Sequence, residues 1–196
     1  MSQTNPITFD TSQLEKVAAS AGLSEEDLRN IWRLSLDDTT NWAHKESAKQ
    51  LGQDLKVPYP AMRKRIRANR RTNPTEASLW YGFNPIGLKH LKAKQDGDGV
   101  TTTANKVPGA FIVPMLNSHV FKRTGEKRLM KRGIYRGKMR EAIEKQSLPV
   151  DDYATTVLST KMLPKVADYF MDRLFFHLDR ALGQAEGTSR AQFQIK

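Results

Sequence analysis

The sequence predicts an α+β fold with an N-terminal helical region, a small antiparallel sheet and a C-terminal amphipathic helix. Apolar residues recur at three- and four-residue steps near both ends of the chain, which indicates helices with one buried side. Between them, apolar and polar residues alternate in short segments bounded by Gly and Pro, a pattern typical of antiparallel strands. The 196 residues fit one domain over 23–183, with an arm or short helix over 1–22 and a flexible tail over 184–196.

A long helix is expected over residues 24–54. Ser24 is a favourable N-cap, and the three acids that follow it complement the positive end of the helix dipole. A shorter helical turn over 11–21, ended by Gly22, is expected before it. Residues on one side of the long helix recur at helical spacing and are expected to be buried: Leu28, Ile31, Trp32, Ser35, Thr39, Trp42, Ala43 and Leu51.

Prolines and glycines divide the middle of the chain. Pro60 is well placed in the first turn of a second short helix that runs to about residue 67. Alternation over 75–83 predicts a half-buried strand. Residues 89–106 are rich in Lys and Thr around an Asp-Gly-Asp-Gly turn, so they are expected to form an exposed loop.

A hairpin and a helix are predicted in the second half. Strands are expected over 110–116 and 119–123, with a turn at 124–126. The expected core residues of this hairpin are Phe111, Val113 and Val120. Apolar residues share one face over 163–182, which predicts an amphipathic helix that Gly183 ends.

The net charge of +11 is concentrated in two segments. Residues 63–71 contain six basic residues and no acid, and residues 122–140 contain nine basic residues and one acid. Such an excess either faces a negative partner or is solvated. The candidate contacts with DNA or a partner protein are Arg63, Lys64, Arg65, Arg67, Arg70, Arg71, Lys122, Arg123, Lys127, Arg128, Lys131 and Arg132.

The remaining composition argues against catalysis. Cysteine is absent, which excludes disulfides and thiolate chemistry, and the four histidines lie apart without metal-ligand spacing. Asp151 and Asp152 are adjacent and therefore do not converge as an acid–base pair. We expect no catalytic residue, no metal and no cofactor. No apolar run approaches the roughly 18 residues that span a bilayer, so no membrane partner is expected.

Three interpretations of the basic segments stay open. They form a solvated surface, an unspecific surface for phosphates or an acidic protein, or part of a helix-turn-helix DNA-binding regulator over residues 48–71. The pattern from Ala48 to Val57 is similar to a scanning helix followed by a turn. However, Pro58 and Pro60 fall where the recognition helix should already be running.

Several short motifs occur in an order that resembles a known family, the phage minor tail protein Z family of tail-completion proteins. A helix over 36–55 leads into an RKRI segment, and Pro85 and Ile86 follow a predicted strand. A PGAFI segment comes next, formed by Pro108, Gly109, Ala110, Phe111 and Ile112. An HVFxRxG segment begins at His119, and Leu148, Pro149 and Val150 are similar to the LPI motif before the last helix. The resemblance covers about residues 31–182.

Membership in this family would imply a structural protein of the virion tail and neck, made in the host cytoplasm. Such a subunit completes the head-proximal end of the tail for joining to the head. It forms a ring, expected to be a hexamer by analogy with phage tails, and binds the tail tube or tail terminator and the neck or connector proteins. The ring surrounds the DNA channel, where the basic residues would contact DNA without sequence preference.

Overall fold

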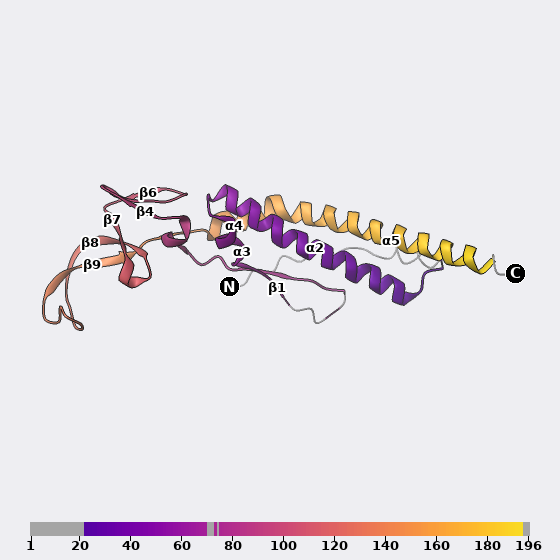
Figure 1. The fold of residues 1–196 in the computed structure, drawn as a ribbon, viewed down its shortest axis with the longest axis horizontal. Coiled ribbons are helices and arrows are strands. Elements are labelled where there is room, and N and C mark those ends of the chain that lie inside the picture. The colour runs from indigo at the N-terminus through magenta and orange to yellow at the C-terminus, as the bar shows by residue number, and fades with distance from the viewer. Residues whose placement is uncertain (1–21, 70–72, 74, 194–196) are drawn as a thin grey trace. The chain divides into compact units, whose positions relative to one another are not determined.

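The computed structural model describes residues 22–69, 73 and 75–193, and beyond residue 183 only the path of the backbone. The fold is α+β as predicted, with an N-terminal helix, several small antiparallel sheets and a C-terminal helix (Figure 1). Two compact units are present. Unit 1 comprises the described parts of Met1–Ser47, Ile66–Tyr81 and Thr156–Lys196, and unit 2 comprises Ala48–Arg65 and Gly82–Thr155. The sequence predicted one domain over 23–183. Whether the two units associate into one domain is not shown by this division, so that prediction stays a prediction.

Unit 1 is built mainly from two antiparallel helices, α2 (Glu25–Asp54) and α5 (Leu163–Phe193), which run side by side in Figure 1. The last residues of α2, from Ala48 onward, belong to unit 2. A π-helical turn, η3 (Leu158–Met162), leads directly into α5. The helical turn expected over residues 11–21 lies outside the described residues.

The predicted N-cap of α2 is confirmed. The Asp27 amide donates to the Ser24 hydroxyl at 3.2 Å, and the Ser24 amide donates to the Asp27 carboxylate at 3.0 Å. The Ser24 hydroxyl also donates to this carboxylate and holds the pKa of Asp27 below its ordinary value. This reciprocal pair satisfies backbone donors that the first turn of a helix leaves free.

The predicted stripe of α2 is confirmed in part: Ile31, Ser35, Thr39, Ala43 and Leu51 are buried, whereas Leu28, Trp32 and Trp42 are half-buried. Ser47, which was not predicted, extends the buried side. Ser35, Thr39 and Ser47 are buried. The Ser35 and Thr39 hydroxyls donate to the carbonyls four residues earlier, both at 2.7 Å, so their burial leaves no polar group unpaired. Small hydroxyl side chains thus occupy positions where larger apolar residues would be the usual choice.

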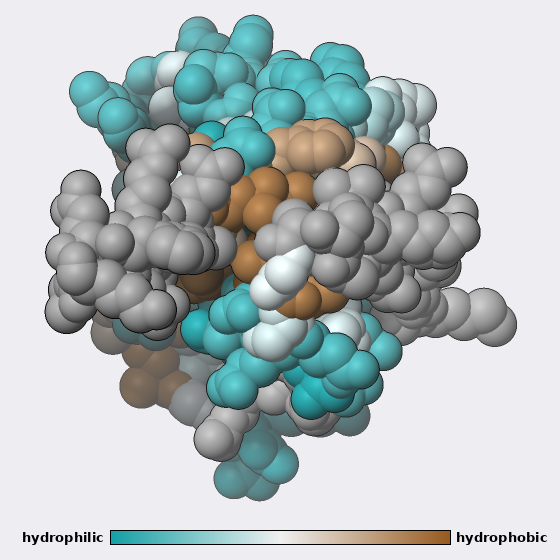
Figure 2. All heavy atoms as spheres, turned by 90° about the vertical axis from the view of Figure 1, so that its right-hand side faces the viewer, coloured by the Kyte–Doolittle hydropathy of each residue, from teal (hydrophilic) through white to brown (hydrophobic). Residues whose placement is uncertain are grey.

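The core of unit 1 lies between α2 and α5. Phe170 meets Trp32 edge to face, with 5.0 Å between the ring centroids, and Trp42 stacks on Tyr169 at 4.4 Å. Figure 2 shows apolar side chains gathered near the centre of one end of the molecule, with hydrophilic side chains above and below them. The buried members of this cluster are Ile31, Phe170, Leu174 and Leu178.

The prediction that Gly183 ends the last helix is wrong, because α5 continues to Phe193. A glycine weakens a helix interior by about 1 kcal/mol but does not stop it. A glycine stop requires a left-handed backbone, and Gly183 is not among the residues with positive φ. Residues 194–196 of the predicted tail lie outside the described residues.

A short hairpin completes unit 1. β1 (Ile66–Ala68) pairs with β2 (Leu79–Tyr81), with Ile66 opposite Tyr81. The Tyr81 hydroxyl lies 3.0 Å from that of Ser47, and the His44 ring lies 3.0 Å from the Ile66 carbonyl. The second helix was predicted to reach residue 67, but α3 (Tyr59–Arg63) ends earlier because Ile66, a buried β-branched residue, begins the strand. The strand predicted over 75–83 is confirmed in a shorter form.

Unit 2 consists of small antiparallel sheets and short helices. β3 (Ile86–Gly87) pairs with β10 (Ser147–Leu148), and β4 (Lys94–Asp96), β5 (Gly99–Thr101) and β6 (Lys106–Pro108) form a meander. A second three-stranded sheet contains β7 (Ala110–Val113), β8 (His119–Leu129) and β9 (Met139–Lys145). The helical elements are α3, the 3-10 turns η1 (Leu88–Leu91) and η2 (Pro114–Leu116), and α4 (Asp151–Val157), which crosses into unit 1.

The prediction of an exposed loop over 89–106 is wrong, because this segment forms η1 and most of the β4–β5–β6 meander. Gly97 and Asp98 are a two-residue hairpin turn between the paired residues Asp96 and Gly99. A Cβ atom at Gly99 would lie 2.3 Å from the Val107 carbonyl oxygen, so only glycine permits β5 and β6 to approach this closely.

The predicted hairpin of β7 and β8 is confirmed, but the turn expected at 124–126 is not a turn. β8 continues to Leu129 through a bulge between Arg123 and Lys127, where Gly125 has a φ of 81°. Val120 is buried as predicted, whereas Phe111 and Val113 are only half-buried. Phe111 instead packs beside Phe121 on the neighbouring strand, with 6.5 Å between ring centroids.

The substitution Phe170→Ala should lower the free energy of unfolding of unit 1 by about 3 to 5 kcal/mol, because it leaves a cavity between α2 and α5. All three tryptophans, Trp32, Trp42 and Trp80, belong to unit 1. Urea denaturation followed by tryptophan fluorescence therefore measures this unit alone.

Phe175→Ala is the matched control, because Phe175 lies on the same helix with 51% of its surface exposed. Its effect should stay within about 0.5 kcal/mol. Equal losses in the two variants would contradict the described packing of α5.

Candidate functional site

The net charge of the chain belongs entirely to one unit. Counted over the full sequence ranges of the two units, including positions that the structure does not describe, unit 2 contains 19 Lys and Arg against 8 Asp and Glu, whereas unit 1 contains 13 of each. Unit 2 therefore carries the whole +11, and unit 1 is formally neutral. A folded unit with this excess has a strongly positive field, which attracts polyanions and acidic surfaces.

The first basic segment is divided between different roles. Arg63, Lys64 and Arg67 are exposed, and Arg67 lies on β1 in unit 1. Arg65 is partly buried and has structural partners. Arg70 and Arg71 lie outside the described residues. Of the four predicted contact residues that the structure describes in this segment, three are therefore exposed cations.

Arg65 joins two segments of unit 2 that are distant in sequence, residues 48–65 and the segment that begins at Gly82. Its guanidinium donates to the carbonyls of Gly82 at 3.3 Å, Asn84, and Pro85 at 3.4 Å, while its own carbonyl accepts from the Gly82 amide at 2.8 Å. Partial burial lowers the pKa of Arg65, yet a guanidinium stays charged at neutral pH. Sequence reasoning treated Arg65 as a contact for DNA or a partner, but these bonds give it a structural task.

The second basic segment lies on the β8–β9 hairpin and is exposed throughout. Lys122 faces Glu144 and Lys127 faces Glu141 across the two strands, an arrangement that stabilises the pairing. The predicted contact residues of this segment are all exposed: Lys122, Arg123, Lys127, Arg128, Lys131 and Arg132.

One cross-strand pair on this hairpin places two like charges opposite each other. Arg128 lies directly opposite Arg140, which is unfavourable. Arg128 is paired with Glu126 at 3.1 Å, and the Arg140 guanidinium lies 3.7 Å from the centre of the Tyr135 ring. Each cation has its own neighbour, but the hairpin would be more stable with an acid at one of these positions. Local conflicts of this kind tend to mark functional surfaces.

The far part of this hairpin combines positive charge with exposed apolar side chains. Leu129, Ile134 and Met139 are 56%, 87% and 58% exposed. The structure places residues 130–145 at the tip of the hairpin and on β9. Three of the nine basic residues counted over residues 122–140, Arg136, Lys138 and Arg140, were not among the candidate contacts predicted from the sequence, and they too are exposed. The glycines at 133 and 137, both with positive φ, were the turn signals that could have indicated this hairpin.

The PGAFI segment is structural in this fold. Pro108 ends β6, Gly109 turns the chain with a φ of 70°, and residues 110–112 begin β7. The Gln95 side chain of β4 accepts from the Ile112 amide at 2.8 Å and donates to the Ala110 carbonyl at 3.3 Å. The segment thereby links the two three-stranded sheets of unit 2.

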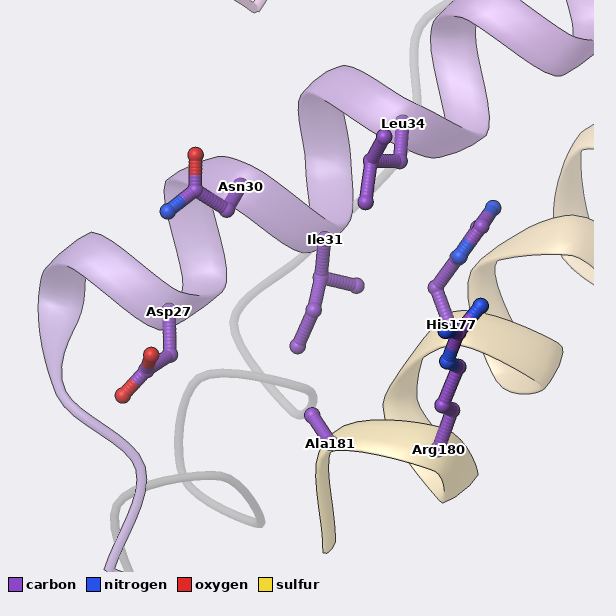
Figure 3. Close-up of a pocket in the computed structure, with 7 residues that line it drawn as sticks. All are labelled: Asp27, Asn30, Ile31, Leu34, His177, Arg180 and Ala181. Carbon is purple, nitrogen blue, oxygen red and sulfur yellow. The ribbon is translucent and has the colours of Figure 1, made fainter. Parts of the chain in front are cut away.

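A cavity of about 300 Å³ lies between α2 and α5 in unit 1 (Figure 3). The His177 ring is hydrogen-bonded to Asp38 at 3.0 Å, and Asp27 is hydrogen-bonded to Ser24. The cavity is lined by Asp27, Asn30, Ile31, Leu34, His177, Arg180 and Ala181.

Metal clusters and helical membrane spans are both absent from the part of the chain that the structure describes. No group of three or more His, Cys, Asp or Glu side chains there could hold a metal ion. None of the described helices combines the length and apolar character that a membrane span requires.

The substitution Arg65→Ala should destabilise unit 2 by about 1 to 3 kcal/mol, because it removes charge-assisted bonds to three carbonyls. Hydrogen exchange at the Gly82 amide is the appropriate measurement, since that amide is bonded to the Arg65 carbonyl. Arg63→Ala, at an exposed position two residues earlier, should leave the exchange rate nearly unchanged. If both variants protect Gly82 as the parent does, Arg65 has no structural role.

Comparison with protein-family models, curated proteins and solved structures found no match to this chain.

Proposed function

We propose that the chain is a structural protein of a phage tail and neck, which completes the head-proximal end of the tail for joining to the head. The ordered motifs that resemble the minor tail protein Z family support this proposal. The observation that carries it is the confinement of the whole net charge of +11 to unit 2. A protein that surrounds DNA without reading its sequence needs many Lys and Arg that face phosphates.

The geometry of the β8–β9 hairpin supports contact with a large negative surface. Its cations are exposed, and those at the tip are accompanied by exposed apolar side chains. Unlike charges are paired along its base, so the free positive charge is concentrated toward its far part. Such a hairpin suits an element that reaches along DNA or into a neighbouring subunit.

In this proposal the subunit forms a closed ring, hexameric by analogy with phage tails, and surrounds the DNA channel. Its neighbours are the tail tube or tail terminator on one side and the neck or connector proteins on the other. Exposed aromatic residues of α5, Phe175 at 51% and Phe176 at 47%, support a contact between protein subunits. The role is one of assembly without catalysis, and its location is the virion.

No specific observation favours a helix-turn-helix regulator over residues 48–71. The helix that follows the turn, α3, has five residues, and Ile66–Ala68 is a strand. A recognition helix must be long enough to present several side chains to the major groove. The structural proposal therefore has the stronger support.

The double substitution Lys131→Glu and Arg132→Glu should lower the yield of DNA-filled particles with attached tails by about tenfold, because it replaces attraction to phosphates with repulsion. Neither residue has a described ion pair, so the fold should be retained. Particle yield in a complementation assay, with electron microscopy of the products, measures the effect.

The matched control is Lys45→Glu with Lys165→Glu, which changes the net charge equally at exposed positions of unit 1. This control should assemble and retain DNA like the parent. Equal defects in both variants would attribute the effect to net charge alone, and unaffected assembly in both would remove the hairpin from the proposed role.

A further inference from the structure

Three side chains of unit 2 converge over Gly87. A Cβ atom at this glycine would lie 3.7 Å from Cε of Lys145, 3.9 Å from Cδ2 of His90 and 4.0 Å from Nδ1 of His119. These residues come from β9, η1 and β8, and β8 packs against η1. Because Gly87 has no side chain, the position that a Cβ atom would occupy, within van der Waals distance of all three groups, is empty.

The charges around this space are all positive. Burial, followed by the cations Lys89, Arg65, Lys145 and Lys64, holds the pKa of His90 below its ordinary value. Burial, followed by Lys145, Lys89 and His90, does the same for the pKa of His119. No carboxylate is among the groups that act on either imidazole. Within the described part of the chain, the charged groups that act on these two imidazoles are therefore all cations.

One polar atom of this cluster lacks a partner. Nδ1 of His119 is buried and has no hydrogen-bond partner among the described residues. Such an atom needs an explanation, because buried polar groups in folded proteins are almost always paired. An anion at this position would accept hydrogen bonds from the imidazoles and the ammonium group, all of which are donors when protonated.

We propose that His90, His119 and Lys145 form a phosphate site over Gly87, which takes one phosphodiester group of a DNA backbone. This inference rests on the proposed function, in which the basic unit faces channel DNA. A backbone phosphate is the ligand that fits an all-positive cluster in a unit with a net charge of +11. The site adds no base readout, so it contributes affinity without sequence preference.

The site makes DNA binding dependent on pH. Burial and neighbouring cations favour the neutral imidazoles in the free protein, and a bound phosphate favours the protonated forms. Binding therefore raises the pKa of both histidines and takes up protons. DNA affinity should increase as the pH falls from about 8 toward 6, and should level off below the pKa values of the free protein.

Gly87→Ala is the sharpest variant, because a methyl group would fill the space without changing the charge. The backbone there, with a φ of −58° and a ψ of 131°, accepts alanine. The full-length variant should bind a mixed-sequence duplex of about 20 base pairs roughly tenfold more weakly, as expected for losing one charge-assisted contact. Gly97→Ala is the matched control, since a Cβ atom there meets nothing within 4 Å.

Two further measurements separate the site from general attraction. Lys145→Gln should reduce the slope of log affinity against log salt by about one, and Lys94→Gln, at an exposed lysine of β4, should affect it less. In NMR titrations, DNA should shift the resonances of His90 and His119 and raise the pKa of both. Inorganic phosphate should produce the same shifts with much weaker binding.

Three results would overturn the inference: unchanged histidine pKa values on adding DNA, equal affinities of the two glycine variants, or shifts with inorganic phosphate but not with DNA. A parent protein without DNA affinity would also overturn it. If the parent protein does not bind DNA but the double variant Lys131→Glu and Arg132→Glu fails to join tails, the phosphate site is refuted and the assembly role is retained. If that variant fails to assemble but binds DNA normally, the assembly role and the phosphate site are independent of each other.

Discussion

The mutual repulsion of the positive charges in unit 2 is the constraint on which the rest of this molecule depends. A net +11 in a unit with small sheets costs stability, and the fold offsets part of that cost locally. Glutamates face lysines along the base of the β8–β9 hairpin, and Arg65 uses backbone carbonyls as its acceptors. Where no such partner exists, as at the hairpin tip and over Gly87, positive charge is left for an external anion.

Unit 1 meets a different requirement. It is formally neutral, and its stability comes from the packing of α2 against α5 around Phe170, with hydroxyl groups bonded inside α2. The hydrophobic packing of unit 1 is thus separate in sequence and charge from the strongly basic unit 2. A charge change on unit 2 can therefore alter partner affinity while the helical core of unit 1 is unaffected, which is what a structural subunit facing DNA requires.

Periodicity predicted the helices well, because their signals are local. The Ser24 cap, the stripe of α2 and the apolar face of α5 follow from spacing alone. The ends of elements were less predictable. Gly183 does not end α5, since a glycine stops a helix only where the backbone turns left-handed.

Long-range pairing explains most of the other errors. The segment over 89–106 is polar and rich in turn residues, yet Gln95 and the close approach at Gly99 tie it into a sheet. For the candidate site, charge counting found both basic segments, but it could not distinguish the partly buried Arg65 from the exposed Arg63. The convergence of His90, His119 and Lys145 joins residues far apart in the sequence, so no local pattern could predict it.

We propose that this chain is a ring-forming subunit of the phage neck whose basic unit faces DNA. An electron cryomicroscopy reconstruction of intact particles tests it most directly. The account predicts a closed ring at the head-proximal end of the tail, with the β8–β9 hairpin and the Gly87 site of unit 2 beside the channel DNA. A monomer or simple dimer in the virion, or a ring whose unit 2 faces bulk solvent, would contradict it.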